Sequence, residues 1–227
     1  MLVLAVETAT AWGSVAVVGP QGLLVERAAH VPGGHLEWLL PAIDAALADA
    51  GLRREAIEGL VVSRGPGGFS GLRIGIATVA AWAHAAGRPL VAVSTLEVMA
   101  EGASASGLVL AALDARRGEI AGAVFRRDGA IQRVTPDFMG PPAALRDRLG
   151  ALSEPVSVTG DALERHAAAI VEALGPPARL LPRTEWFPRA SVAGALGRAR
   201  LLRGERDDPL GLVPIYVRSQ AVREYPA

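Results

Sequence analysis

A glycine-rich loop is the part of the sequence whose residue types and spacing best suit binding chemistry. It runs from Gly65 to Gly75 and reads Gly-Pro-Gly-Gly-Phe-Ser-Gly-Leu-Arg-Ile-Gly. Gly65 and Gly67 allow a tight turn and close approach of the backbone to a ligand. Ser70 is placed to cap the following helix, whose N-terminus then faces a phosphate. The loop has neither the lysine of a P-loop nor the spacing of a dinucleotide fingerprint.

The same stretch has a packing interpretation, which we favour. Gly71 and Gly75 lie one helical turn apart and form a smooth stripe with Thr78, Val79 and Trp82. Such a stripe lets another helix approach closely.

A charged group lies at the tip of a predicted hairpin, where Asp114 is followed by Arg116 and Arg117. A carboxylate beside guanidinium groups is able to bind the charges of a partner. Asp at the end of a strand more often forms a turn, and this is the interpretation we favour.

Missing residue types exclude several kinds of chemistry. The chain has 0 Cys and no Lys, so all 23 basic residues are Arg. Disulfides, thiol nucleophiles, Cys-type zinc sites, Schiff bases and a P-loop lysine are therefore excluded.

Charge and hydropathy predict a cytoplasmic chain without a membrane span. The 23 acidic residues balance the basic ones, which argues against a whole-domain grip on nucleic acid or on an anionic membrane and leaves room for a local basic patch. The first residues have no basic n-region and are typical of a strand. The longest apolar helical stretch, 74–86, is shorter than the roughly 20 residues that a bilayer requires.

The elements that must position these residues are predicted from periodicity. Strands at 2–6, 14–18 and 23–28 precede helix 35–51, strand 59–63, helix 71–86, strand 90–93 and helix 95–101. Five apolar residues of the first helix share one face and are expected in the core: Leu36, Leu39, Leu40, Ile43 and Leu47. A Gly/Ser/Ala stretch at 101–107 is followed by strands 108–113, 119–125 and 156–159 and by helices 162–174 and 190–202.

This order predicts an α/β fold of two parts. Strand-strand-strand-helix-strand-helix is the order of the ribonuclease-H-like half that actin-like ATPases use twice. We expect one full half over residues 1–102, with the glycine loop and its helix, and a smaller α/β domain over residues 103–227.

Several motifs, taken together, resemble the TsaB (YeaZ) family. They are Val-Leu-Ala-Val-Glu-Thr-Ala-Thr at the start, the glycine loop, Val-Ser-Thr-Leu-Glu at 93–97, Asp-Ala-Arg-Arg-Gly-Glu at 114–119 and Pro-Ile-Tyr-Val-Arg from Pro214. The resemblance covers nearly the whole chain and is strongest through residues 1–100. It implies an actin-like fold and a non-catalytic subunit that binds TsaD.

The resemblance also implies a pathway and partners. With TsaD and the ATPase TsaE, such a subunit takes part in making threonylcarbamoyladenosine beside the anticodon of tRNAs that read codons starting with A. Contact with tRNA is expected only through the complex, and a homodimer when the chain is alone. Because the family pairs through its N-terminal half, the stripe is the expected partner interface.

TsaD, the catalytic relative of this family, has a metal site whose two histidine ligands have no counterpart in this chain. That relative carries His-x-Glu-x-His after the strand that follows the glycine-loop helix, whereas this chain has Thr95 and Met99 at the two histidine positions and keeps only Glu97. A hydroxyl or a thioether does not replace imidazole for such an ion. We therefore expect neither a metal nor a catalytic residue.

Glu7, Thr8 and Thr10 lie in the first turn, where actin-like ATPases hold phosphate and magnesium, usually with an Asp. Glu reaches one methylene further, which argues against tight magnesium geometry. Capping of the turn by the two threonines is an equally good interpretation. No cofactor is expected to be required, and weak binding of ATP or ADP stays open.

The rival hypothesis is a stand-alone enzyme of the actin-like superfamily, either a small-molecule kinase or a glycoprotease-like peptidase. The absence of Lys and Cys, the lost histidine pair and the small second domain argue against it.

Overall fold

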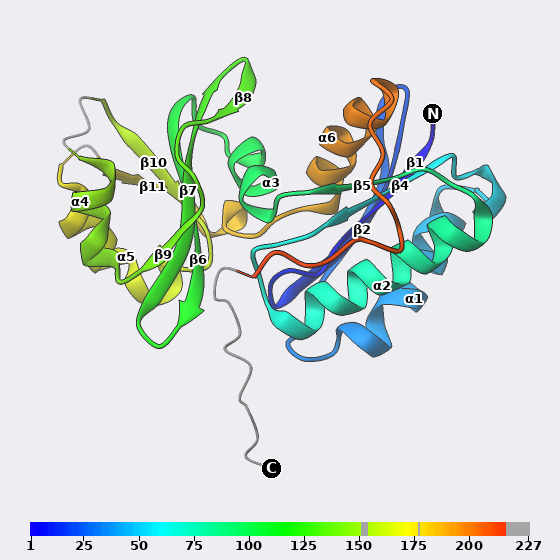
Figure 1. Cartoon of the computed structure of the whole chain (residues 1–227), viewed down its shortest axis with the longest axis horizontal. Helices are drawn as coiled ribbons and strands as arrows, with labels where there is room; N and C mark the ends of the chain where they lie inside the picture. Colours follow the sequence, from blue (N-terminus) through cyan, green and yellow to red (C-terminus); the bar gives the residue numbers. More distant parts are fainter. Residues whose placement is uncertain (151–153, 177, 217–227) are drawn as a thin grey trace, which may run out of the picture.

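The computed structural model describes residues 1–150, 154–176 and 178–216, which form two β-sheets with helices packed on them (Figure 1). The first sheet has five strands in the order β3-β2-β1-β4-β5. Their bounds are Val3–Glu7 (β1), Trp12–Gly19 (β2), Gly22–His30 (β3), Gly59–Ser63 (β4) and Leu90–Val93 (β5). β1 pairs antiparallel with β2 and parallel with β4, and the element order predicted for the N-terminal half is confirmed.

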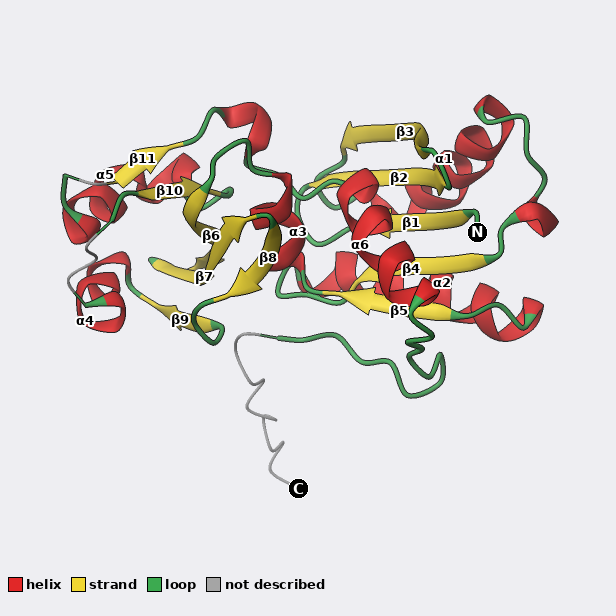
Figure 2. Ribbon diagram, turned by 90° about the horizontal axis from the view of Figure 1, so that it is seen from above, coloured by secondary structure: helices red, strands yellow, loops and turns green. Residues whose placement is uncertain are grey.

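Helices cover both faces of this sheet (Figure 2). Two lie on one face and the third on the other: α1 (His35–Asp49), α2 (Phe69–Ala86) and α6 (Ala190–Leu202). Leu4 and Val6 of β1 pack toward α1 and α2, whereas Val3 and Ala5 pack toward α6. A strand that is apolar at successive positions is typical of a sheet covered on both sides. No helix among the described residues is long and apolar enough to cross a membrane.

The second sheet has the order β11-β10-β6-β7-β8, with β9 paired to β7. Its strands are β6 (Gly107–Arg116), β7 (Glu119–Asp128), β8 (Ala130–Arg133), β9 (Phe138–Gly140), β10 (Val156–Thr159) and β11 (Ala178–Leu180). One face carries α4 (Leu145–Leu149) and α5 (Leu163–Leu174), and the other carries α3 (Thr95–Gly102). Short 3-10 turns lie at Arg54–Ala56, Pro142–Ala144 and Arg183–Glu185.

The chain returns to the first sheet after completing the second. α6 lies against β1, β2 and β4, and its Gly194 and Gly197 leave no room for a side chain between the helix and Val18 or Val61. The expectation of one smaller domain over residues 103–227 is therefore wrong for α6. Periodicity reveals that this segment is a helix, but it does not reveal the sheet on which the helix packs.

A C-terminal strap, residues 205–216, closes the outer edge of β5. Asp207 donates its backbone N–H to the carbonyl of Leu90 at 2.8 Å, and its carboxylate accepts the N–H of Ala92 at 2.8 Å. The guanidinium of Arg200 donates to the carbonyl of Ala92 at 2.7 Å. These groups form hydrogen bonds with the edge of β5, as a neighbouring strand would. An unpaired strand edge leaves N–H and C=O groups that can bond to other chains.

Two leucines of α1 do not lie in the core, contrary to expectation. Leu39, Ile43 and Leu47 are buried, but the side chains of Leu36 and Leu40 are 68% and 54% exposed. They lie on the side of α1 that faces solvent, because the apolar stripe of this helix is wider than the surface of the sheet that it covers.

Candidate functional site

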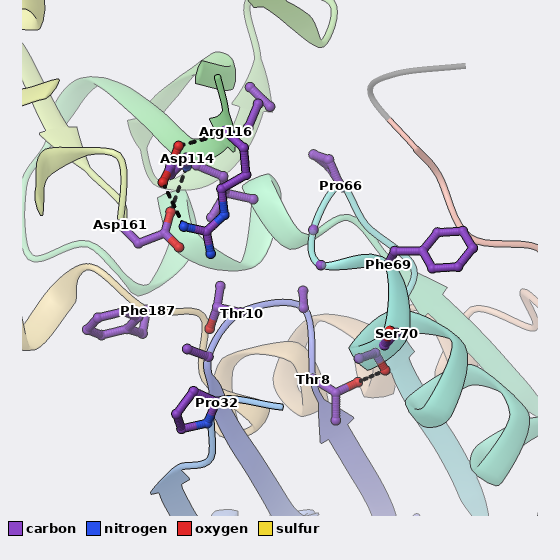
Figure 3. Close-up of a pocket in the computed structure, with 18 of the residues that line it drawn as sticks. Thr8, Thr10, Pro32, Pro66, Phe69, Ser70, Asp114, Arg116, Asp161 and Phe187 are labelled. Atoms are coloured by element: carbon purple, nitrogen blue, oxygen red, sulfur yellow. Dashed lines mark hydrogen bonds and ion pairs between the residues drawn. The ribbon is translucent and has the colours of Figure 1, made fainter. Parts of the chain in front are cut away.

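A cleft of about 1190 Å³ lies between the two sheets (Figure 3). The β1–β2 turn and the start of α2 form one wall, and the β6–β7 hairpin and the loop before α5 form the other. The cleft therefore joins segments that are far apart in the sequence. The sequence candidates that line it are Thr8, Thr10, Gly67, Ser70, Gly71, Asp114 and Arg116, whereas Glu7, Gly65 and Arg117 lie outside its lining.

Glu7 is buried at the end of β1 and takes part in structure rather than in the cleft. Its carboxylate accepts the backbone N–H of Ala9 at 2.7 Å and the hydroxyl of Ser63 on β4. Burial raises the pKa of this carboxyl group from 4.5 to about 7, against the lowering effect of hydrogen bonds with Ser63 and with the backbone of Ala9 and Thr8. The carboxylate is thus held within the fold and does not point at a ligand.

The two threonines of the first turn are also used within the chain. The hydroxyl of Thr8 donates to the carbonyl of Gly71 at 2.8 Å. The hydroxyl of Thr10 accepts the N–H of Trp12 at 3.2 Å, which is a turn-capping bond. These contacts favour the structural interpretation of both residues over phosphate binding.

The glycines of the loop approach other parts of the same backbone. A methyl group at Gly65 would overlap the carbonyl oxygen of Ile215, and one at Gly67 would overlap that of Ala9. The same holds for Gly71 against the carbonyl of Thr8 and for Gly75 against its hydroxyl. The motif is thus explained by the close seating of the first turn and the C-terminal strap on α2.

Two expectations about α2 need correction. Ser70 lies inside the helix and does not cap it, since the N-cap position is Gly68 and no side chain bonds to the free N–H groups there. Of the proposed interface stripe, Gly71, Gly75 and Val79 are buried against the chain's own sheet and turn. Thr78 and Trp82 are half-buried, and Trp82 packs against the core that lies between the sheet and the helices α1 and α2.

The two positions of the lost histidines are in the protein interior. Thr95 begins α3 with no exposed surface, and its hydroxyl oxygen is buried without a hydrogen-bond partner in the described structure. Met99 is 1% exposed and packs in the core between α3 and the second sheet. Within the described ranges, no three His, Cys, Asp or Glu side chains converge to hold a metal ion.

The hairpin tip presents charged groups to the cleft. The carboxylate of Asp114 accepts the backbone N–H of Arg116 at 2.9 Å and its guanidinium at 3.2 Å, so Asp114 does form the predicted turn. Arg165 of α5 lies 3.7 Å from the same carboxylate. Arg116 and Arg117 have positive φ angles of 65° and 55°. Figure 3 shows Arg116 reaching into the cleft beside Asp161 and toward Thr10.

Asp161 is a cleft residue that sequence reasoning missed. Its carboxylate accepts the N–H of Asp114 at 2.8 Å and thereby ties the loop after β10 to the base of the hairpin. Burial raises the pKa of Asp161 from 3.8 to about 6. The signal was available, because Gly160 and Asp161 directly follow a predicted strand, and ligands commonly bind outside the carboxyl ends of parallel strands.

Aromatic residues at the rim were missed as well. The rings of Phe69 and Tyr216 lie 5.2 Å apart, and the guanidinium of Arg73 stands 3.7 Å from the centre of the Phe69 ring and donates to the Tyr216 hydroxyl at 2.9 Å. Phe187 lines the cleft and packs on Trp12. Aromatic rings thus lie at the rim of the cleft. Of its two walls, one consists of turns whose polar groups are hydrogen-bonded within the chain, and the other carries charged side chains.

Comparison with known proteins gives a consistent result. Residues 29–153 match the family described as TsaD, tRNA N6-adenosine threonylcarbamoyltransferase. The chain is 28% identical to the tRNA threonylcarbamoyladenosine biosynthesis protein TsaB of Bacillus subtilis over 96% of this chain and 94% of that protein. It is 39% identical to the protein of the same name from Escherichia coli over 67% of this chain and 68% of that protein. The solved structure of YeaZ from Pseudomonas aeruginosa superposes with a TM-score of 0.82 at 28% identity, covering 95% and 99% of the two chains.

Proposed function

The chain belongs to the TsaB (YeaZ) family and has its α/β, actin-like fold, and from this premise we propose that it is a non-catalytic subunit of the machinery that makes tRNA threonylcarbamoyladenosine. In this proposal it binds TsaD and acts together with TsaE, and tRNA is bound by the assembly rather than by this chain alone.

The observation that carries the proposal is the burial of Thr95 and Met99. Neither side chain ligates a divalent ion well, and both are packed in the interior, where an ion has no access without repacking of α3. A chain with the fold of a transferase but without its metal ligands is suited to a binding role. The residues that bind TsaD are then expected on the exposed surface of this chain.

The outer surface of α1 and α2 is the contact face that we propose. The two helices lie side by side on one face of the first sheet (Figure 1). Leu36 and Leu40 stand out from α1, and Ala77 and Ala81 are exposed on α2. Large exposed apolar side chains on one helix and small ones on the other allow a helix pair of another chain to pack closely. The same face supports a homodimer when TsaD is absent.

No cofactor is part of the proposed role. We expect only weak affinity for ATP or ADP at the glycine loop, because Thr8, Ala9 and the loop glycines are already bonded or packed against one another.

The test is reconstitution of threonylcarbamoyl transfer from an added activated threonylcarbamoyl donor to tRNA by purified TsaD and TsaE, with and without this chain. We expect transfer to depend on the chain, and the chain alone to turn over neither ATP nor a peptide. Full transfer without the chain contradicts the proposal, and turnover of ATP or of a peptide by the pure chain favours the rival enzyme hypothesis.

A further inference from the structure

The helices α1 and α2 of the proposed contact face run in the same direction. Near their starts, a methyl group on Gly71 of α2 would lie 3.1 Å from the His35 ring of α1. Just after their ends, the guanidinium of Arg88 donates to the carbonyl of Glu55 at 2.9 Å. The two helices are therefore parallel neighbours on one face of the first sheet (Figure 1), and residues equally far from His35 and Gly71 lie at the same level along them.

The contact face carries an unpaired charge of each sign at one level. Glu37 is two residues beyond His35, and Arg73 is two residues beyond Gly71. Both side chains are exposed, and in the part of the chain that the structure describes Glu37 has no ion pair and Arg73 has no carboxylate partner. The other carboxylates of α1 are paired within the chain, Asp44 with Arg54 and Asp49 with Arg27. Glu37 and Arg73 are thus available to charges on another molecule.

The guanidinium of Arg73 is held in place before any partner binds. It stands 3.7 Å from the centre of the Phe69 ring, and its Nε donates to the Tyr216 hydroxyl at 2.9 Å. Among the described residues, no group accepts from its two terminal nitrogens. A carboxylate can accept from such a pair of nitrogens, and a side chain that is already ordered loses little entropy on binding. Arg73 is therefore suited to anchor a carboxylate of a partner.

The sizes of the side chains on the two helices are also complementary. Leu40 is five residues beyond His35 and Ala77 is six beyond Gly71, so they lie within about 2 Å of one level. The leucine is 54% exposed, and the alanine is exposed as well. A large residue of α1 can therefore pack on a small residue of α2 if α1 of one copy lies on α2 of another.

We propose that two copies of this chain pair about a two-fold axis parallel to α1 and α2, with Glu37 of each copy bonded to Arg73 of the other. This arrangement lays α1 of one copy on α2 of the other with equal levels together, so Leu40 meets Ala77. An axis across the helices would instead lay α2 on α2, and α2 contains no carboxylate for Arg73. The two-fold symmetry repeats the ion pair, so each charge acts twice. The proposal rests on the contact face of the proposed function and adds the orientation of the second copy and the charges that fix it.

Exchange of the two charges tests the pair. Glu37→Arg and Arg73→Glu each place like charges opposite one another, so we expect each variant alone to self-associate at least about tenfold more weakly in sedimentation at low salt. An equimolar mixture of the two should sediment as the wild-type dimer, because each contact then joins an arginine to a glutamate. A variant that failed to fold could not be rescued in this way. Glu172→Arg on α5 and Arg179→Glu on β11 make the same substitutions elsewhere and should pair as wild type does.

Self-association of either single variant at the wild-type strength, or a mixture that stays monomeric, overturns the pairing of Glu37 with Arg73. A wild-type chain that sediments as a monomer overturns it as well. Leu40→Glu separates this result from the fate of the contact face. If it dissociates the wild-type dimer while the charge exchange has no effect, the face stands and the parallel axis is wrong. None of these measurements uses TsaD, so they are independent of the reconstitution of threonylcarbamoyl transfer.

Discussion

The carboxylate of Glu7 and the hydroxyl of Ser63 are hydrogen-bonded across the neighbouring parallel strands β1 and β4, and neither residue has exposed surface. This pair joins the central strand β1 to its neighbour β4 at the point where the chain turns toward the cleft. A titratable group at such a position links the stability of the first sheet to pH.

We predict that Glu7→Gln flattens part of the dependence of stability on pH. The folded-state pKa of Glu7, about 7, exceeds its ordinary value of 4.5, so folding favours the protonated form. Above both pKa values the fold must bury a charge, which lowers the free energy of unfolding by about 3 kcal/mol relative to the value below pH 4.5. That stability is lost as pH rises from 4.5 through 7.

Urea unfolding of wild type and Glu7→Gln between pH 4 and pH 8 measures this effect as a difference. The comparison is needed because Asp161, with a folded-state pKa raised to about 6, titrates in the same window and contributes equally to both proteins. Parallel curves for the two proteins would show that Glu7 does not carry the linkage.

Gly75→Ala is expected to destabilise the fold by about 1–3 kcal/mol, because the added methyl group meets the hydroxyl of Thr8. The midpoint of urea unfolding measures the loss. Ala81→Ser, on the exposed side of the same helix, is the control and should change stability by less than about 0.5 kcal/mol. An unchanged midpoint for Gly75→Ala would mean that α2 shifts freely on the turn. A bulky residue at Gly75 would therefore destabilise the fold, so its effect would not measure pairing with TsaD.

Leu36→Glu and Leu40→Glu are expected to weaken pairing with TsaD, and self-association, by at least about tenfold while leaving Tm nearly unchanged. Both leucines are more than half exposed, so a charge there has little effect on the folded monomer but is desolvated in a helix–helix contact. Co-purification and sedimentation measure the two effects. Leu23→Glu on β3 places the same charge on a leucine that is 51% exposed and should leave pairing intact. Equal pairing by all three variants would exclude this face.

Asp207→Ala should lower the free energy of unfolding by about 1 kcal/mol, because the N–H of Ala92 loses its acceptor. Asp207→Asn keeps a carbonyl oxygen at the same place and should recover most of the loss. Light scattering during storage measures the second consequence, since an opened strand edge favours association between chains. Equal stability of both variants and wild type would show that the strap does not depend on this bond.

The fold was largely predictable, because strands β1, β4, β5 and β10 are short apolar runs and α2 is bounded by glycines. The placement of α6 was not, since its weak pattern fits either sheet. Sequence also singled out Thr8, Ser70 and Asp114, which line the cleft, but it did not predict that the hairpin and the first turn face each other across it.

The direction of the side chains could not be predicted from the sequence. The same glycine spacing serves a phosphate, a partner helix or a neighbouring turn, and only the position of Thr8 decides among them. Leu36 and Leu40 share a helical face with core residues, and the width of the sheet determines which of them are covered.

The return of α6 to the first sheet has a consequence for synthesis on the ribosome. Val3, Ala5 and Val61, made early, lie on the face of the sheet that is covered by α6, residues 190–202, made late. This face of the first sheet therefore stays uncovered until residues 190–202 have been made, and a fragment that stops after the second sheet is expected to precipitate or to need a chaperone.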